Sequence, residues 1–599
     1  MINDFDSMGV KLVVITEPFI VETSDNFSYL DQNHLLCTDS TGNSYIMEDF
    51  WAGSSALLDL TIPEAKNWML GYYDARIQEG VAGFWCDLGE PQQQPAGMYH
   101  NIGTAHFVHN IYSLIWENMI YNYYRQSYPE TRVLTLPRSG YAGMQRFSTF
   151  PWSGDVHRSF EGFRTQIPII LGMGMSGVGY MHCDMGGFAS GTFDPELYTR
   201  WLQFGAFAPV MRAHSQEQVP PEPIFYPEPY KSIVRDYIKL RYRMLPYNYS
   251  NAWHNHVNGR PLMLPVNFFD QDQQMLENLN DEYLWGKNIL VAPIMNQGQI
   301  TRDVILPTGK WIYYWTNEAY SGLRPVSVNA PIEWMPLFVK AGSFLPMVDT
   351  LLTTENYNTD SLIVKYYPDH ENPTSSFTLY DDDGKTPNAF AIEQYDILNF
   401  SGSLTLSDLW IQLNREGPGY TGMPETRKIC FEIQRITSEP EEVLKNGLVL
   451  PQVSSMEEFL TIAEGTYWDS SEKILYLLVH MTNQSDEIQI HLIEIANTIE
   501  KPAISELVDF HLQHPFPNPF SQSTTINLEV YQPGDYQIEI INLTGHILKQ
   551  INFTMNYAGT RQITWNGSDV EGQTITSGIY YVKASGKHST QHTKIVFIN

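Results

Sequence analysis

The first 250 residues contain six short apolar runs, and stretches with helical periodicity separate several of them. Residues 62–80 predict the clearest helix, because Pro63 suits a first helical turn and apolar residues such as Met69 and Tyr72 share one face. Strand–helix alternation of this kind requires parallel strands joined by right-handed crossovers, which limits the fold to an α/β barrel or a doubly wound sheet. The six runs are KLVVITEP (11–18), VAGFWCD (81–87), RVLTLPRSG (132–140), FSTFPWSGD (147–155), GVGYMHCD (177–184) and PVMRAHS (209–215).

Each of these runs closes at or beside a polar side chain. In a (β/α)₈ barrel the carboxyl ends of the strands form the active-site face, so this distribution favours a barrel over an open sheet. Six strands are legible where a barrel has eight. We therefore expect residues 1–250 to form an incomplete (β/α)₈ TIM barrel whose first two strands lie upstream of Met1. The polar residues are Glu17, Asp87, Arg138, Asp155, Asp184 and His214.

After the barrel the pattern changes to short alternating segments with Gly and Pro between them, which is typical of β-sandwiches. We expect a proximal β-sandwich over residues 251–346 and a distal β-sandwich over 347–498. Residues 499–514 carry no strong periodicity and predict a linker. Residues 515–599 alternate again and predict a small separate β-sandwich.

The charge balance limits the classes of partner. The chain has 36 basic and 67 acidic residues, for a formal net charge of −31. Nucleic acids and anionic membranes require basic surfaces, so neither is an expected ligand. Aromatic residues make up 13% of the chain, which suits stacking against a neutral ligand such as a carbohydrate. No segment offers ~18 consecutive apolar residues, so no membrane span is expected, and the N-terminal MINDFDSMGV lacks the features of a signal peptide.

Nothing in the sequence predicts a metal or an organic cofactor. GMGMSG (172–177) precedes a strand instead of following one, so it is not a dinucleotide loop. HNH (254–256) has no evident third ligand, and YDDDG (380–384) predicts a tight acidic turn. The cysteines share no CxxC spacing and are expected to be buried free thiols instead of disulfide or zinc ligands. They are Cys37, Cys86, Cys183 and Cys430.

Asp87 and Asp155 are the candidate catalytic pair. Hydrolysis of a glycoside with retention needs two carboxyl groups ~5–5.5 Å apart, one as nucleophile and one as acid and then base. Strand ends at one barrel mouth can supply such a pair. Trp152 and other aromatic residues could raise the pKa of the acid by desolvation, while Arg138 or Arg212 could keep the nucleophile ionised. Structural caps or salt bridges remain an alternative role for both aspartates.

Four motifs, GFWCDLGEP, RSGYAGMQRFSTFPWSGDV, GYMHCDMGGF and APVMRAHS, together resemble glycoside hydrolase family 31, the retaining α-glucosidase and α-xylosidase family. The motifs follow the order of the family, and the resemblance continues through LWGKNILVAPI and FTLYDDDGKT into two β-sandwiches. The chain departs from the family at its start, where an N-terminal β-sandwich and two barrel strands are expected but not seen. The resemblance thus implies an N-terminally truncated member.

The resemblance implies a role for each matching residue. Asp87 matches the nucleophile and Asp155 the general acid/base. Glu90 is expected to support the loop after the nucleophile by a hydrogen bond, and Trp152 to support the acid. The residues that match the sugar-binding subsite are Trp51, Trp85, Arg138, Asp184, Phe188, Arg212 and His214.

The tail has a resemblance of its own. The segments HPFPNPFSQSTTINLEV and SGIYYVKASGKHSTQHTKIVFIN resemble the C-terminal sorting domain of the type IX secretion system of Bacteroidetes. This implies export to the medium or the cell surface through that machinery, with residues 515–599 as the sorting signal. An ordinary accessory or carbohydrate-binding β-sandwich is the alternative.

The expected activity is that of a retaining exo-acting α-glycosidase, with an α-linked oligosaccharide as substrate and α-glucosidase as the favoured reaction. A 4-α-glucosyltransferase would use the same covalent intermediate, and a non-catalytic carbohydrate-binding protein is a third possibility. The sequence leaves open the preferred sugar, the linkage and the oligomeric state.

Overall fold

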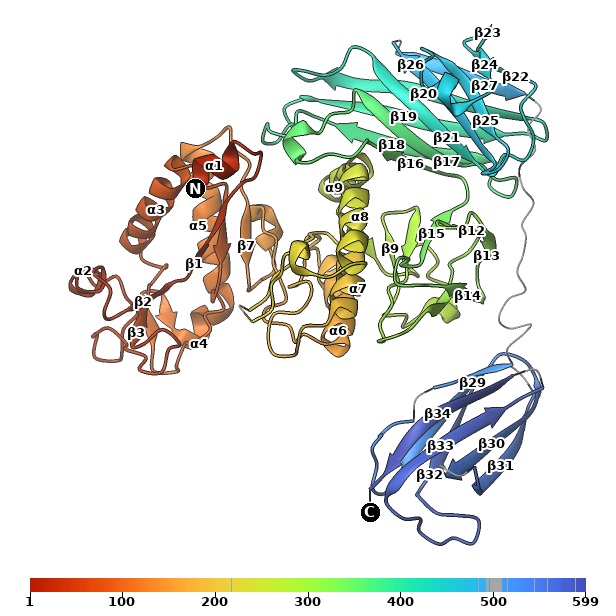
Figure 1. Cartoon of the computed structure of the whole chain (residues 1–599). Helices are drawn as coiled ribbons and strands as arrows, with labels where there is room; N and C mark the ends of the chain where they lie inside the picture. Colours follow the sequence, from red (N-terminus) through yellow and green to blue (C-terminus); the bar gives the residue numbers. More distant parts are fainter. Residues whose placement is uncertain are drawn as a thin grey trace. The chain divides into compact units, whose positions relative to one another are not determined.

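The computed structural model of the chain describes residues 1–216, 218–482, 484–491, 495, 509–513, 515–542, 545–556, 559–587 and 589–598 (Figure 1). The chain divides into two units. The first comprises residues 1–302, 309–318 and 329–497, and the second comprises residues 303–308, 319–328 and 498–599.

A parallel sheet organises the N-terminal part of the first unit. Its strands β1 (Val13–Thr16), β4 (Gly83–Cys86) and β7 (Thr135–Pro137) pair in the order β1-β4-β7. Three of the predicted strands continue this series as single parallel bridges in place of longer ladders. The bridges are Thr135–Thr149, Trp152–His182 and Met185–Ala213. The six predicted runs are therefore parallel neighbours in chain order, as the barrel prediction requires.

Helices alternate with these strands. Helix α3 (Pro63–Gln78) begins at the predicted proline. Tyr72, which we expected on its buried face, is exposed, and Tyr73 is buried in its place. The reason is a polar contact, because the Tyr73 hydroxyl lies 3.0 Å from Thr16 Oγ1 and accepts a hydrogen bond from Trp116 Nε1 at 2.8 Å. Tyr73 thus joins α3 to strand β1 and to the helix that carries Trp116.

The remaining elements of this part lie before, between or after the strands of this sheet (Figure 1). The helices are α1 (Ile2–Asp6), α2 (Phe27–Gln32), α4 (Ala105–Val108), η1 (His109–Ile111), α5 (Tyr112–Ser127), η2 (Met144–Phe147), α6 (Phe160–Met175), α7 (Pro195–Gly205), η3 (Pro223–Phe225), α8 (Tyr230–Arg243) and α9 (Leu245–Asn258). The short strands are β2 (Phe19–Val21), β3 (Ser55–Leu57), β5 (Tyr99–His100) and β6 (Gly103–Thr104).

Antiparallel sheets follow the last of these helices, as the change in sequence pattern predicts. Five strands of the first unit pair in the order β12-β15-β10-β9-β8. They are β12 (Lys310–Tyr313), β15 (Leu337–Lys340), β10 (Ile289–Val291), β9 (Tyr283–Trp285) and β8 (Met263–Leu264), with η4 (Gln274–Leu276) between β8 and β9.

Two six-stranded sheets then enclose a common apolar core, which is a β-sandwich. The first sheet contains β16 (Ser343–Met347), β17 (Ser361–Tyr367), β21 (Arg427–Gln434), β26 (Ile474–Met481), β25 (Gly465–Asp469) and β24 (Gln452–Val453). The second contains β18 (Thr374–Asp381), β19 (Tyr395–Leu404), β20 (Asp408–Gly419), β27 (Ser485–His491), β22 (Glu442–Lys445) and β23 (Leu448–Val449). The short helices η5 (Thr354–Asn356) and α10 (Met456–Phe459) lie in its loops.

The acidic segment after β18 forms a turn that ties this sandwich to the N-terminal part of its unit. The Gly384 N–H donates to Asp382 Oδ1 at 2.8 Å, which closes the turn. Asp382 also accepts hydrogen bonds from Arg132 Nη2 at 3.1 Å and from the Tyr249 hydroxyl at 2.7 Å. The acidic residues of this segment therefore serve a structural contact here.

The second unit contains a smaller β-sandwich around its own core. One sheet has the order β28-β29-β32 and the other β31-β30-β33-β34. Most of the predicted linker, residues 499–508 and 514, lies outside the described residues. The remaining part of that range contains β28, which pairs with β29, so the tail sandwich begins upstream of the predicted residue 515. The strands of this sandwich are β28 (Phe510–Leu512), β29 (Thr524–Val530), β30 (Gly534–Asn542), β31 (Ile547–Met555), β32 (Gly559–Trp565), β33 (Gly578–Ser585) and β34 (Thr590–Phe597). Three further strands outside its two sheets lie wholly or partly in the second unit: β11 (Thr301–Ile305), β13 (Ala319–Ser321) and β14 (Pro325–Asn329).

None of the four cysteines forms a disulfide, as predicted, whereas the expectation that all four are buried is wrong for Cys430. Cys37, Cys86 and Cys183 are buried, and Cys430 is half-buried. None of the helices in the described part of the chain combines the length and the apolarity needed to cross a bilayer.

Candidate active site

Glu17, Asp87 and Arg138 lie side by side at the carboxyl edge of the parallel sheet, because each directly follows a paired strand. Thr16 and Cys86 are register partners. The Asp87 N–H donates to the Thr16 carbonyl at 3.0 Å, and the Arg138 N–H donates to the Cys86 carbonyl at 3.2 Å. The hydrogen bonds between neighbouring strands therefore continue past the strand ends, and they keep Glu17, Asp87 and Arg138 next to one another at the same edge of the sheet.

The next three strands bring Asp155, Asp184 and His214 to the same edge. The Trp152 N–H donates to the Pro137 carbonyl at 3.3 Å, which carries the register on from the third strand. Each of the three polar residues comes just after a bridge between neighbouring strands. The polar strand ends that the sequence predicts thus form one face.

Asp87 is largely buried, with 17% of its side chain exposed. Arg138 Nη1 lies 3.4 Å from Asp87 Oδ1, and the Leu88 N–H donates to the same oxygen at 2.8 Å. Burial raises the pKa of the Asp87 carboxyl, Arg138 and the Leu88 N–H oppose that shift, and the charges of Glu90 and Asp155 add to it. The cation expected to keep Asp87 ionised is in place, but desolvation outweighs it.

Arg138 is held mainly by Glu90. Its Nε lies 2.7 Å from Glu90 Oε1 and its Nη2 lies 3.0 Å from Glu90 Oε2, while Nη2 also donates to Gln92 Oε1 at 3.2 Å. A carboxylate that binds two guanidinium nitrogens fixes the plane of the arginine. The segment after Asp87 therefore orients the cation that faces Asp87.

Asp184 is a buried acid with one strong partner. Its Oδ1 pairs with Arg212 Nη2, and only 1% of its side chain is exposed. Burial raises the pKa of Asp184 to about 7; Arg212 opposes this, and the charges of Asp155 and Asp87 contribute to it. Three carboxyl groups, those of Asp87, Asp155 and Asp184, thus lie within electrostatic range of one another.

Aromatic rings surround this acid cluster. The Trp85 ring packs edge-on against Trp152 at 5.4 Å and against His214 at 4.8 Å, and Phe188 stacks on His214 at 5.1 Å between ring centroids. The Arg212 guanidinium lies 5.2 Å from the Trp85 ring and 5.6 Å from the Trp152 ring. Burial and the charge of Arg212 lower the pKa of His214 to about 4, so its imidazole is neutral at neutral pH. Apolar ring surface beside polar groups is what a sugar ring requires.

Four buried polar atoms in this cluster have no hydrogen-bond partner among the described residues: Trp85 Nε1, Trp152 Nε1, Arg212 Nε and Asp184 Oδ2. Buried polar atoms are rarely left unpaired, because each loses its hydration on burial. Three donors and one acceptor in one cluster are complementary to a ligand that carries hydroxyl groups.

Two predicted site residues are more exposed than the rest. Asp155 is exposed and lies in the loop beyond Trp152. Trp51 is 71% exposed. Glu17 was expected at a strand end but was given no role in the site. Its pKa is raised, because burial and the Asp87 charge outweigh the opposing effects of a Trp51 hydrogen bond and Arg138. Its position at the end of KLVVITEP was the signal that could have identified it.

One group of side chains in the described residues has the spacing to hold a metal ion, and it lies outside this acid cluster. Its members are Cys37, Asp59 and His100.

Comparison with known families identifies three parts of the chain. Residues 1–251 match the glycosyl hydrolases family 31 TIM-barrel domain, and residues 259–345 match the glycosyl hydrolase family 31 C-terminal domain. Residues 515–599 match the secretion system C-terminal sorting domain. Both resemblances that the sequence motifs indicate are confirmed.

The relatives of this chain differ from one another in activity. Alpha-glucosidase 2 of Bacillus thermoamyloliquefaciens is 32% identical over 455 residues, which cover 73% of this chain and 56% of that protein. An isomaltosyltransferase of Sporosarcina globispora is 28% identical over 506 residues, covering 80% of this chain and 44% of that protein. The solved structure of a Flavobacterium johnsoniae GH31 dextranase complexed with glucose has a TM-score of 0.77 and 29% identity, and the match covers 82% of this chain and 63% of that one. The chain spans about half the length of its curated relatives.

Proposed function

Because residues 1–251 and 259–345 belong to glycosyl hydrolase family 31, we propose that this chain is a retaining exo-acting α-glycosidase that releases terminal α-linked glucose from oligosaccharides. The observation that supports this best is the joint presence of Asp87, Asp155 and Asp184 at one edge of the parallel strands, beside buried polar atoms that lack partners. The likeness to an α-glucosidase favours glucose as the released sugar.

In the proposed mechanism Asp87 is the nucleophile and Asp155 the general acid and base. Asp87 attacks the anomeric carbon while Asp155 protonates the departing glycosidic oxygen, which yields a β-glycosyl-enzyme from an α-glycoside. Asp155 then takes a proton from water, and the water oxygen displaces Asp87. The exposure of Asp155 suits this double role, because it must reach a leaving group first and a water molecule second.

The remaining residues of the cluster hold the sugar. Asp184 accepts hydrogen bonds from hydroxyl groups through its free Oδ2, and the indole N–H groups of Trp85 and Trp152 donate to them. Arg212 keeps Asp184 in place, and His214 stacks on Phe188 to form the wall against the C–H face of the ring. Arg138 and Glu90 position and tune Asp87.

Covalent trapping tests the proposal directly. A 5-fluoro-α-glucosyl fluoride should label the protein once, and peptide mass spectrometry should place the label on Asp87. Asp87→Ala should abolish the labelling and lower turnover of maltose by several orders of magnitude, with an unchanged circular dichroism spectrum. A label on another residue, or most of the rate retained in Asp87→Ala, would show that the nucleophile is misassigned.

A glucosyltransferase is the second candidate, because an isomaltosyltransferase is among the relatives and the same intermediate serves both reactions. Product analysis at high maltose separates the two: longer oligosaccharides indicate transfer, and glucose alone indicates hydrolysis. Calorimetric binding of maltose without any product would instead indicate a carbohydrate-binding protein.

We further propose that residues 515–599 direct export through a type IX secretion system to the medium or the cell surface, since they match a secretion system sorting domain. A reporter protein that carries a signal peptide and is fused to residues 509–599 should leave the cell in a strain that has this machinery and be retained when the machinery is deleted.

A further inference from the structure

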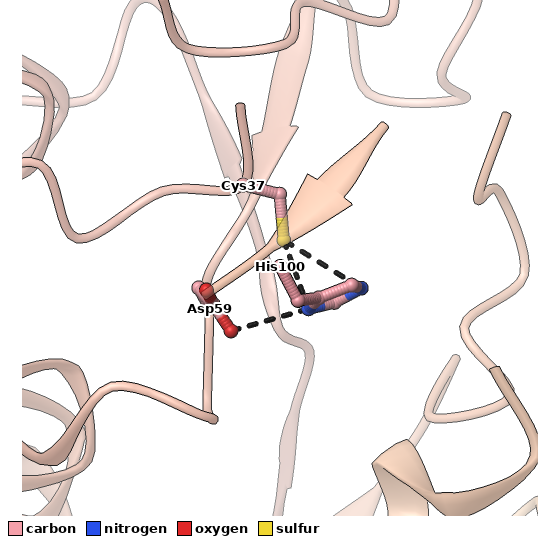
Figure 2. A group of neighbouring side chains, drawn as sticks. All are labelled: Cys37, Asp59 and His100. Atoms are coloured by element: carbon pink, nitrogen blue, oxygen red, sulfur yellow. Dashed lines mark hydrogen bonds and ion pairs between the residues drawn. The ribbon is translucent and has the colours of Figure 1, made fainter. Parts of the chain in front are cut away.

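Cys37, Asp59 and His100 meet in the interior of the first unit although they are far apart in the sequence (Figure 2). Cys37 lies between α2 and β3, Asp59 between β3 and α3, and His100 ends β5. Their exposed fractions are 0%, 1% and 5%. Figure 2 shows the thiol, the carboxylate and the imidazole pointing at one another.

The thiol and the carboxylate both lie nearest to the same ring nitrogen of His100. Cys37 Sγ lies 3.3 Å from His100 Nδ1 and 3.8 Å from Nε2, and Asp59 Oδ1 lies 3.1 Å from Nδ1. A nucleophilic cysteine triad needs the thiol and the carboxylate on opposite ring nitrogens, so that the base is oriented on one side and acts on the other. One proton on Nδ1 can also bond well to only one of the two neighbours, and Asp59 Oδ1 already accepts hydrogen bonds from the Thr61 N–H at 3.0 Å and the Thr61 hydroxyl at 2.6 Å. The arrangement is therefore neither a catalytic triad nor a simple hydrogen-bonded chain.

A metal ion at the point where the three groups converge would satisfy all of them. Zinc bonds of about 2.3 Å to sulfur and about 2.0–2.2 Å to nitrogen and oxygen, at tetrahedral angles, separate the ligand atoms by roughly 3.4–3.6 Å. The observed S–N and N–O separations are within a few tenths of an ångström of these values, and the ligand atoms of all three residues lie within 4.8 Å of one another. A thiolate and a carboxylate also balance the two positive charges of the ion, which a buried site requires.

The far side of the imidazole has the partner that a metal-bound histidine needs. The Gln94 amide contacts His100 Nε2, and its other end lies 2.8 Å from His109 Nδ1. With its amide turned by 180°, Gln94 presents its oxygen to the Nε2–H and its nitrogen to His109. A hydrogen bond of this kind fixes the tautomer that leaves Nδ1 free to bind a metal.

The ligands are also held in position by the backbone. The Cys37 N–H donates to the Leu57 carbonyl at 2.8 Å, and the Asp59 N–H donates to the Leu35 carbonyl at 2.9 Å. Asp59 Oδ2 accepts from the Asn101 N–H at 2.6 Å. We propose that Cys37, Asp59 and His100 bind one Zn²⁺ ion, with the fourth position open to water. The ion would anchor the segment that runs from Asp87 through Gln92 and Gln94 to His100.

Metal analysis and cobalt substitution of the full chain test this proposal. Plasma mass spectrometry of chain purified without chelator should find about one zinc per chain. Exchange for Co²⁺ should give a thiolate-to-cobalt charge-transfer band in the near ultraviolet, together with the visible bands of tetrahedral cobalt. Cys37→Ser should remove the charge-transfer band, whereas the matched control Cys430→Ser, a thiol of the distal sandwich, should keep it.

A third variant keeps the test decisive if Cys37→Ser does not fold. Gln94→Ala changes a half-buried side chain and should weaken zinc binding about 10- to 100-fold in a chelator competition. Absence of zinc and of any cobalt–thiolate band in the unsubstituted chain would overturn the proposal. A band that persists in folded Cys37→Ser would overturn it as well.

Discussion

Arg138 and Glu90 form a two-pronged ion pair, with 2.7 Å between Nε and Oε1 and 3.0 Å between Nη2 and Oε2. The same guanidinium lies 3.4 Å from Asp87 Oδ1. Glu90 thus has two effects on Asp87: it draws the arginine toward itself, and its own charge raises the pKa of Asp87.

We predict that Glu90→Gln shifts the acidic limb of the pH profile of kcat/KM to lower pH. A group whose pKa is raised must lose its proton before it can act as a nucleophile, so the limb follows Asp87 in the free enzyme. Removing the Glu90 charge lowers that pKa, and Arg138 can also move closer to Asp87. The maximal kcat/KM should fall by about 10- to 100-fold, because Arg138 loses its fixed orientation.

Gln92→Ala is the control for this prediction, because Gln92 also binds Arg138 Nη2, at 3.2 Å, but carries no charge. Its acidic limb should stay where it is. A shift of the acidic limb to higher pH in Glu90→Gln would contradict the electrostatic role of Glu90. So would a shift of the same size in Glu90→Gln and Gln92→Ala.

Asp155→Ala should damage hydrolysis of a disaccharide far more than that of an activated aryl glucoside. General acid catalysis contributes about 10²- to 10⁴-fold when the leaving group needs a proton, and little when it does not. The measurement is the pre-steady-state rate of glycosylation with each substrate. Equal loss with both would show that Asp155 does not protonate the leaving group.

The sequence predicts the strand ends well, because each apolar run stops at a polar residue and parallel strands share one edge. It could not show that Glu90 takes the shortest contacts of Arg138, since that depends on the path of the loop after Asp87. The exposure of Asp155 and Trp51 likewise depends on loops. Cys37, Asp59 and His100 lie far apart in the sequence and form no motif of regular spacing. The expectation of no metal site was based on such motifs and therefore could not include this cluster.

Trp51→Ala should raise KM for maltotriose about tenfold, which corresponds to ~1.4 kcal/mol of binding free energy, and leave kcat nearly unchanged. Its ring is 71% exposed and interacts with Glu17, whose own carboxyl senses the charge of Asp87. An exposed aromatic ring beside the acid cluster can stack on a bound sugar without taking part in bond cleavage. Trp51→Phe should keep KM within a factor of about three. A fall in kcat with unchanged KM would contradict a binding role.

Glu117→Gln should make the first unit more stable at pH 8 but not at pH 4.5. Glu117 is fully buried on α5, and burial raises the pKa of its carboxyl to about 7, with Thr135 and Cys86 opposing the shift. Because the folded pKa lies above the unfolded value, the folded state retains a proton that the unfolded state releases. The contribution of Glu117 to the free energy of unfolding is therefore complete below pH 4.5, and it is lost as the pH rises to about 7.

The size of this effect follows from the shift in pKa. A difference of about 2.5 units between folded and unfolded states corresponds to ~3 kcal/mol of unfolding free energy, as an upper limit. A neutral glutamine of the same shape has no such loss, so the two proteins should have similar denaturation midpoints in urea at pH 4.5 and diverge as the pH rises to 8. Glu130→Gln, at an exposed position before β7, should follow the unsubstituted chain at both pH values. If the difference between Glu117→Gln and the unsubstituted chain is the same at pH 4.5 and pH 8, Glu117 is not the buried titrating group that its surroundings indicate.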